Sequence, residues 1–506
     1  MTTKKLFISL ALSTLIVTGC SDSSPVSNAG STGTPTTNDT NNTQPSTTAN
    51  DINNTEPPTT VNDVNNTQPP TTTTPPENNT STQISGNIGL DANFNQSGVI
   101  TLAEDKMKIV ALDSNDNIFT LSSYSYGSEN YLKKHTPAGV IDSSFATDGI
   151  FTISEQLDNT YTRSVLTKMI ITDTNIFLLG STLKDAVYIP FVAKLSLSGV
   201  LDTSFALNGF AFLIENQVSN VRPASFIIDH LGNFIVAGRI RINANYEVYV
   251  AKFNANGVLD TSFNTTGVKI FSKIASDDNL NDTVASVVVD SVNNIYLGGS
   301  SEKIYTVVNR EFFEPDPFIL KLTPTGEIDT SFAVNGKVLV PDPTDDNTGR
   351  QYRVDNTIDL LIDQSDSLYL LGQEENQQIK YLLKYDLNGQ LDSSFEDNGK
   401  LIFNKNNLLD TTYIFAIALD ANKNLFLAGT NPTTSPLNID MFIKKYTADG
   451  VLDTSFNTTG TYNYTQAYRS SPIDVAVDSN GRVIVVGSQA EERAPAQGRI
   501  WVLNIL

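Results

Sequence analysis

The sequence predicts an all-β fold, a seven-bladed β-propeller of four-stranded blades, on three observations. One motif, (Leu/Ile)-Asp-x-(Ser/Asn)-Phe-x-x-x-Gly, occurs seven times at intervals of about 60 residues. Short apolar segments between the copies alternate with turn residues, and no segment has a convincing helical period. Repeats of this size form one cooperative array and not separate domains. The copies begin at Leu90, Ile141, Leu201, Leu259, Ile328, Leu391 and Leu452, and they end at Gly98, Gly149, Gly209, Gly267, Gly336, Gly399 and Gly460.

Each repeat contains the same series of predicted strands. The motif glycine opens an alternating segment such as Gly399–Phe403, and a variable loop then leads to an apolar strand ending in Asp, such as Phe226–Asp229. A tight turn leads to a strand that ends in glycine, such as Asn424–Gly429, and a second variable loop leads to a strand such as Phe191–Leu195. Four short strands in every repeat is the organisation of a propeller blade.

The two ends of the repeat region complement each other. The region begins with a motif and its strand, Leu90–Leu102, which no earlier strands precede. It ends with the strands Asp474–Asp478, Arg482–Gly487 and Arg499–Ile505, which no eighth motif follows. We therefore expect the first strand to complete the last blade and to close the ring non-covalently, so that no sheet edge is left open.

The motif residues have structural explanations. Asp and Ser form local turns through side-chain-to-backbone hydrogen bonds, Phe has the size for a core between blades, and Gly permits positive φ. Six blades also place a lysine eight residues before the motif Asp. We expect these pairs to belong to the scaffold, because a residue repeated in every blade does not single out one catalytic centre. The lysines are Lys134, Lys194, Lys252, Lys321, Lys384 and Lys445.

The motif copies resemble the delta-60 repeats of bacterial propeller-like proteins, over essentially all of residues 86–506. The first copy departs mildly from the pattern, since Ala92 and Asn93 stand where the other copies have Thr or Ser followed by Ser. The resemblance implies the fold and no particular activity.

The N-terminal residues 1–19 predict a signal peptide. Lys4 and Lys5 precede the apolar run Leu6–Val17, which is too short for a membrane-spanning helix but suits a secretory signal. The sequence Val17-Thr-Gly-Cys20 resembles the lipobox of bacterial lipoproteins. That resemblance implies diacylglycerol and fatty acyl (palmitate-type) chains on Cys20 and an anchored protein of the cell envelope. Ser21 after the cysteine resembles lipoproteins forwarded to the outer membrane, where the host has one.

Residues 20–85 are expected to be the lipidated cysteine and a disordered tether. Thr, Asn, Pro and Ser dominate the segment, and it repeats every 12 residues, as in Asn38–Ala49. Almost no apolar side chain is present to offset the entropy of ordering the chain. Cys20 is the only cysteine in the chain, so an internal disulfide or a multi-thiolate metal site is excluded.

No catalytic, metal or cofactor site is predicted. The two histidines, His135 and His230, occupy a strand position and a turn, and neither has metal-ligand spacing. The Asp-rich turn Asp113–Asn117 lacks the glycine and distal Glu of a calcium loop, so we interpret it as structural. The inner strands show no unique acid–base pair. A formal charge of −22 argues against nucleic acid as a partner.

Two main function classes remain. The first is a membrane-anchored, monomeric binding or scaffolding module for a protein or glycan partner. The alternative is an enzyme, lyase-like or lactonase-like, that acts from the propeller face, and fold analogy alone supports it. Purely structural display is a third, smaller possibility.

The most elaborate loop, Ser300–Asp316, is the predicted binding surface. It combines aromatic and acidic side chains, the composition of a contact surface. The candidate binding residues are Tyr305, Phe312, Phe313, Glu314 and Asp316, beside Glu311 and the acidic segment Asp342–Asp346. The alternative is that Ser300–Asp316 is a long hairpin extension whose aromatic side chains pack on their own blade.

Replacing Cys20 with Ala should release the protein from the membrane fraction, because no other segment is long and apolar enough to hold it there. Fractionation followed by immunoblotting measures the effect. The control Ser21→Ala should stay membrane-bound, and full retention of Cys20→Ala would contradict the lipoprotein interpretation.

Overall fold

The computed structural model describes residues 88–102, 105–124, 130–213, 221–275, 280–307, 310–340, 355–374, 379–403, 413–432, 439–465, 469–490 and 496–504. Cys20, the predicted signal peptide and the predicted tether lie outside these ranges. In the part that is described, the only helices are three short 3-10 turns, η1 (Ile153–Gln156), η2 (Phe263–Thr265) and η3 (Phe456–Thr458). No helix within the described ranges is long and apolar enough to cross a membrane.

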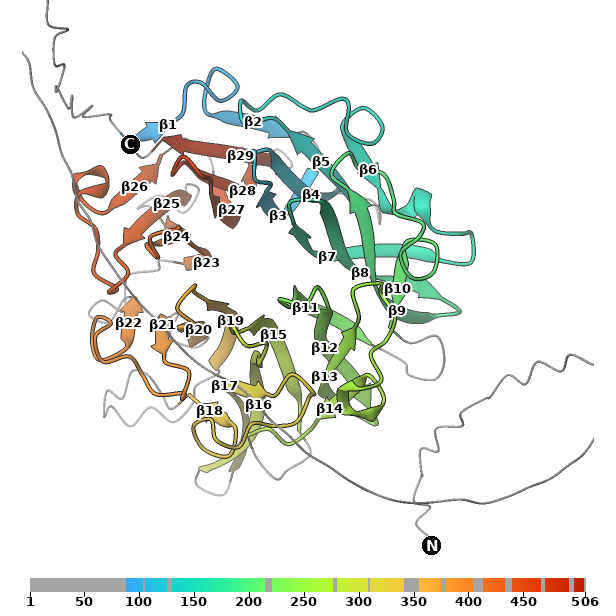
Figure 1. The fold of residues 1–506 in the computed structure, drawn as a ribbon. Helices are drawn as coiled ribbons and strands as arrows, with labels where there is room; N and C mark the ends of the chain where they lie inside the picture. The colour runs from blue at the N-terminus through green and yellow to red at the C-terminus, as the bar shows by residue number, and fades with distance from the viewer. Residues whose placement is uncertain are drawn as a thin grey trace, which may run out of the picture. The chain divides into compact units, whose positions relative to one another are not determined.

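Seven antiparallel sheets stand around a common axis, as Figure 1 shows, so the predicted seven-bladed propeller is confirmed. The innermost strands are β3 (Asp105–Leu112), β7 (Thr162–Ile171), β11 (Arg222–Ile228), β15 (Asp282–Val289), β19 (Asp355–Ile362), β23 (Tyr413–Leu419) and β27 (Arg469–Val477). The second strands are β4 (Ile118–Tyr124), β8 (Asn175–Lys184), β12 (Phe234–Ile242), β16 (Ile295–Val307), β20 (Leu368–Glu374), β24 (Leu425–Pro432) and β28 (Val483–Ala490).

The outer half of each blade contains the third strand and the short strand that follows the motif. The third strands are β5 (Asn130–His135), β9 (Val187–Ser196), β13 (Asn245–Phe253), β17 (Arg310–Leu322), β21 (Ile379–Tyr385), β25 (Ile439–Tyr446) and β29 (Gln497–Asn504). The outermost strands are β6 (Ile150–Thr152), β10 (Phe210–Phe212), β14 (Val268–Phe271), β18 (Lys337–Leu339), β22 (Lys400–Phe403), β26 (Thr461–Tyr464) and, for the seventh blade, β2 (Val99–Leu102).

The hydrophobic core lies between the blades, where the motif Phe was expected. Phe145 is buried and packs in a cluster that joins blades 1 and 2. A Cβ on Gly199, in the turn of the next blade, would lie 2.8 Å from the Phe145 ring, so only glycine allows this approach. The backbone N–H of Ala146 also donates to the carbonyl oxygen of Ser198, 2.8 Å away. Each motif thus connects its own blade to the following one.

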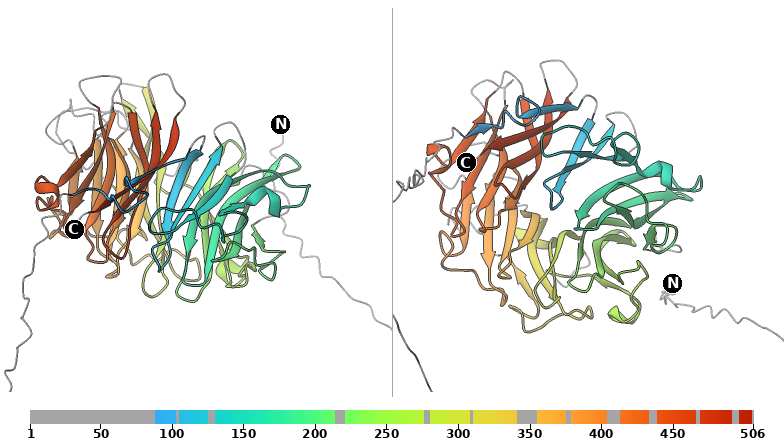
Figure 2. Two further views of the ribbon diagram at one scale, coloured as in Figure 1. Left: turned by 90° about the horizontal axis from the view of Figure 1, so that it is seen from above. Right: turned by 45° about the horizontal axis from the view of Figure 1, so that its top comes forward.

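The ring closes as the sequence predicts. β1 (Gly89–Leu90) and β2 pair with β29, and the register places Val99 opposite Trp501. Figures 1 and 2 show these N-terminal strands beside the C-terminal strand. Main-chain pairing at this junction, about one net favourable kcal/mol per hydrogen bond, replaces a covalent link.

Arg482 reinforces this closure. In blade 7, Val502 stands where other blades have the pairing lysine, and Arg482 supplies the missing cation. Its Nη1 lies 3.1 Å from Asp91 Oδ2, and its Nε lies 2.6 Å from Asp478 Oδ2. Both carboxylates are buried, so their charges depend on this guanidinium.

Five of the six lysines that precede a motif Asp bond to it, as expected of the scaffold. The Nζ–Oδ2 distances are 2.9–3.0 Å for Lys134–Asp142, Lys194–Asp202, Lys321–Asp329, Lys384–Asp392 and Lys445–Asp453. The expectation is wrong for Lys252, whose Nζ lies 3.4 Å from Asp229 and donates to the carbonyl oxygen of Pro324. Lys252 thus bonds to the tight turn of its own blade and to the main chain of the next blade.

In six blades the tight turn after the inner strand contains an aspartate that accepts hydrogen bonds from backbone N–H groups of the same turn, and in blade 2 Thr172 stands in its place. Asp113 Oδ1 accepts hydrogen bonds from the backbone N–H groups of Asn115 and Asn117, at 3.0 and 2.9 Å. Its Oδ2 accepts from the Asn117 side chain at 2.8 Å. Oxygens used in this way make a turn, which agrees with the structural interpretation.

Arg482→Ala should lower the free energy of unfolding by about 3–5 kcal/mol, because it leaves two buried carboxylates without their counter-ion. Urea unfolding followed by fluorescence measures the change. The matched control is Lys269→Ala, since Lys269 pairs with the exposed Glu327 and should contribute at most about 1 kcal/mol. Equal effects of the two variants would mean that Arg482 does not stabilise the closure.

Candidate functional site

Each of the seven inner strands has a β-bulge at the equivalent position along the strand. At this position one residue of each strand is skipped in the pairing with the second strand, and the strand bends there. β7 has a further irregularity between Thr162 and Val165. The skipped residues form what we call the bulge ring: Lys108, Thr167, Ala224, Ala285, Ile358, Phe415 and Ile473. The residues immediately after them, which we call the following position, are Ile109, Lys168, Ser225, Ser286, Asp359, Ala416 and Asp474.

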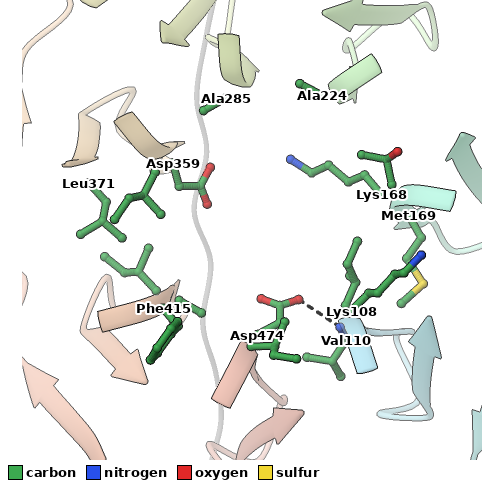
Figure 3. A pocket seen from close by; sticks show the side chains of 16 residues that line it. Lys108, Val110, Lys168, Met169, Ala224, Ala285, Asp359, Leu371, Phe415 and Asp474 are labelled. Atoms are coloured by element: carbon green, nitrogen blue, oxygen red, sulfur yellow. Dashed lines mark hydrogen bonds between the residues drawn. The ribbon is translucent and has the colours of Figure 1, made fainter. Parts of the chain in front are cut away.

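A cavity of about 360 Å³ lies on the axis and is lined by the entire bulge ring. Lys168, Asp359 and Asp474 of the following position also line it (Figure 3). At the following position lysine stands only in blade 2 and aspartate only in blades 5 and 7, whereas the motif residues recur in every blade. The cavity is therefore the place where the blades differ from one another most clearly in chemistry.

Asp474 has a structural contact and a charge. Its Oδ2 accepts a hydrogen bond from the backbone N–H of Val110 in the next blade, at 3.0 Å, and its Oδ1 accepts from Val475 at 2.9 Å. Ser225 makes the equivalent inter-blade bond, since its Oγ accepts from the backbone N–H of Val287 at 3.3 Å. Ser286 also bonds across blades, but there the hydroxyl donates to the carbonyl oxygen of Leu360 at 3.1 Å. A serine would thus suffice for the bond, and the carboxyl group is additional.

Burial raises the pKa of Asp474 to about 7, and the nearby Asp359 adds to this effect. The hydrogen bonds from Val110 and Val475, and the charge of Lys168, act in the opposite direction. Asp359 accepts a hydrogen bond from the N–H of Leu360 at 2.9 Å, and its carboxyl group is directed into the cavity (Figure 3). Two carboxyl groups therefore share one small space at some electrostatic cost.

The cations come from blades 1 and 2. Lys168 Nζ donates to Ser225 Oγ at 2.9 Å, which uses one of its three donors. Lys108 Nζ donates to the side chain of Asn130 and, at 3.4 Å, to the carbonyl oxygen of Leu166. Burial lowers the pKa of Lys108. Lys108 is thus held between blades, whereas Lys168 remains the cation that faces the cavity.

The expectation that the inner strands have no unique acid–base pair is wrong. Asp359, Asp474 and Lys168 are such a set, each occurring in a single blade. Each of them lies three residues before the last residue of its inner strand, a position that comparison of the aligned repeats would have revealed. A strict alternation of inward and outward side chains does not identify these residues, because the β-bulge changes which side chains of the inner strand face the axis.

The predicted binding residues lie on the β16–β17 hairpin, away from this set. The strands pair through to Val307 and Arg310, with Tyr305 opposite Phe312, Ile304 opposite Phe313 and Lys303 opposite Glu314. Asp316 pairs with Ser301 and is partly buried. The loop is thus a long hairpin extension, and the segment Asp342–Asp346 lies outside the described residues.

The two histidines have structural surroundings. His135 is buried in β5 opposite Ile118, as expected for a strand position. His230 lies in the tight turn of blade 3, where its Nε2 is 3.2 Å from the carbonyl oxygen of Asp290 in blade 4. Across the described ranges, no group of three or more His, Cys, Asp or Glu side chains is placed to hold a metal ion.

Residues 232–263 match the family model of a β-propeller domain of unknown function (DUF5122). No curated protein matches the sequence. Among solved structures, an ulvan lyase of polysaccharide lyase family PL25 is similar at 11% identity and a TM-score of 0.45, covering 79% of this chain and 94% of that one. Sqt1 from Chaetomium thermophilum is similar at 11% identity and a TM-score of 0.41, covering 82% and 99%. The family match agrees with the propeller fold, and structural similarities this low carry no information on activity.

Asp474→Ser should become more stable relative to the wild type as the pH rises from about 4 to about 7. The unfolded aspartate titrates near pH 3.9, so between these values the folded protein holds a proton that the unfolded chain has released, and wild-type stability falls. Serine does not titrate and retains the inter-blade bond. Melting temperatures of both proteins across this range measure the difference.

Asp392→Asn is the control for this series. The Ser394 hydroxyl and Lys384 lower the pKa of Asp392, so its contribution to stability is lost only below about pH 4. Its offset from the wild type should be constant between about pH 4 and 8. A constant offset for Asp474→Ser as well would show that Asp474 is ionised throughout.

Proposed function

We propose that this chain is a lipid-anchored envelope protein whose propeller is a binding module that takes a charged group of its partner into the axial cavity. The observation that carries the proposal is the convergence of Asp359, Asp474 and Lys168 on one cavity. These three residues come from blades 5, 7 and 2, so no local turn or strand requirement explains their meeting.

The cavity also has the dimensions of a ligand site. Its volume of about 360 Å³ is at the lower end of the range of about 300–1,000 Å³ for small-molecule pockets. The walls combine apolar side chains with a few charged groups, the usual composition of such sites. The bulge ring is held by strands, and a rigid support preserves the positions of the charged groups.

The partner is proposed to be a protein or glycan at the cell envelope, with the protein itself monomeric. The lipid on Cys20 is proposed to hold the protein at the membrane, in the outer membrane where the host has one. The β16–β17 hairpin with Tyr305, Phe312 and Phe313 is proposed as a second contact for the same partner. The negative net charge suits a cationic partner.

One observation favours the alternative, an enzyme acting from the cavity. A carboxyl group with a pKa of about 7, as in Asp474, is suited to general acid–base catalysis near neutral pH. Recovery of the bound partner group chemically unchanged after long incubation supports binding, and its conversion supports the enzyme.

Ala285→Phe should abolish or strongly reduce partner capture, because the added ring occupies the cavity without touching the charged residues. Ala285 lies on the bulge ring in blade 4 and faces the axis (Figure 3). Crosslinking on intact cells, followed by mass spectrometry of the captured molecule, measures the effect.

Val140→Phe is the matched control, since it adds the same ring at a side chain that is 62% exposed on a turn outside the cavity. A second arm replaces Tyr305, Phe312 and Phe313 with Ser. Loss of capture in this arm, together with full capture by Ala285→Phe, would place binding on the hairpin and would refute the proposal for the cavity.

A further inference from the structure

Three consecutive blades present two carboxyl groups and an aromatic ring to the cavity. Blade 5 contributes Asp359, blade 6 contributes Phe415 and blade 7 contributes Asp474, and Figure 3 shows Phe415 on the wall between the two acids. We call these three residues the acidic arc. In blades 3 and 4 the bulge ring contains only the small residues Ala224 and Ala285, which leave space on the other side of the cavity.

Phe415 is unusual for an aromatic side chain near a propeller axis. It is 43% exposed, although the motif phenylalanines Phe145 and Phe395 are almost fully buried. Its ring centroid lies 6.4 Å from that of Tyr413, which supports it from the same strand. An exposed ring flanked by two carboxyl groups has one obvious complement, a cation that meets the ring face and the negative charges together.

We propose that the acidic arc binds an alkylammonium group of the ligand, with Asp359 and Asp474 as counter-ions and the Phe415 ring as a cation–π partner. This inference rests on the proposed function of the cavity and names the chemical class of the group that enters it. An ammonium group between the two carboxyl groups also relieves their mutual repulsion.

The size and polarity of the cavity restrict the ligand further. A volume of about 360 Å³ accepts a compact amine or one side chain of a partner. Lys168 faces the same cavity and keeps donors beyond the one used by Ser225. A free amino acid can therefore place its carboxylate on Lys168 and its ammonium group on the arc, whereas a protein lysine side chain would use the arc alone.

The repeats themselves provide substitutions that preserve the scaffold. Ser225 and Ser286 occupy the following position in blades 3 and 4 and make the inter-blade hydrogen bonds there. Asp359→Ser and Asp474→Ser therefore remove charge while keeping a residue that this position accommodates. Phe415→Leu removes the aromatic ring, whereas Phe415→Tyr keeps an aromatic ring at the same position.

The test is calorimetric titration of the purified full chain with four probes. They are 4-aminobutyrate, its N-acetyl derivative, butyrate, and Nα-acetyl-lysine N-methylamide as the mimic of a protein lysine. We expect 4-aminobutyrate to bind at least about tenfold more tightly than its N-acetyl derivative and than butyrate, because only it carries the ammonium group. Asp359→Ser, Asp474→Ser and Phe415→Leu should each weaken binding about tenfold, and Phe415→Tyr should not.

The source of the ammonium group follows from the fourth probe. Preference for 4-aminobutyrate, lost in Lys168→Met, indicates a free amino acid, and equal or tighter binding of the lysine mimic indicates a protein side chain. Asp392→Asn, which removes a surface carboxylate outside the cavity, should bind as the wild type does.

The proposal is overturned if the N-acetyl derivative binds as tightly as 4-aminobutyrate, if Asp359→Ser and Phe415→Leu leave amine affinity unchanged, or if no ammonium probe binds. The capture experiment with Ala285→Phe separates this failure from that of the proposed function. Capture that is lost in Ala285→Phe without any amine binding would leave the cavity as a site for another class of ligand. Capture unaffected by Ala285→Phe would remove the cavity as the site altogether.

Discussion

Closure of the ring by the pairing of β2 with β29 is the constraint on which the rest of the structure depends. Six blades are continuous segments of chain, and only the seventh is assembled from both ends. Without β2, the third strand of blade 7 would expose its hydrogen-bonding edge, and Trp501 would lose its cross-strand neighbour Val99. The partly buried Arg482 lies between Asp91 and Asp478 and connects the same two ends electrostatically. A loss of stability at this junction would spread from blade to blade, because each core cluster is shared between two neighbouring blades.

The scaffold and the candidate site use opposite kinds of residue. The motif residue Phe145 and the turn residue Gly199 that it packs against have counterparts at other blade junctions, because these junctions require the same packing. The axial cavity is lined by the bulge ring, in which the residue type varies between blades: two alanines, two isoleucines, one lysine, one threonine and one phenylalanine. A closed ring therefore supplies a rigid frame, and variation at its axis supplies chemistry without disturbing the cores.

The cost of this chemistry is visible in the structure. Burial and the proximity of Asp359 raise the pKa of Asp474 to about 7, and Phe415 exposes apolar surface that could otherwise have been buried. Serine at the same position in blades 3 and 4 makes the inter-blade bond without a charge. A cationic ligand group in the arc offsets both penalties at once, which is why the two features are best explained together.

The sequence by itself determined the number of repeats, the strands in each, the place of the motif Phe and Gly, and the completion of the last blade by Leu90–Leu102. These features follow from local periodicity and from the number of motif copies, because the strands and turns of each repeat are formed by residues close together in the sequence. Only the tertiary structure decided that Asp359, Phe415 and Asp474 meet, because each of them is about 60 residues from the next in the sequence. A β-bulge in each inner strand also sets which side chain faces the axis. The tertiary structure also decided that Lys252 bonds to Asp229 and to the carbonyl oxygen of Pro324 instead of the motif Asp, because Pro324 belongs to the next blade and reaches Lys252 only when the blades pack together.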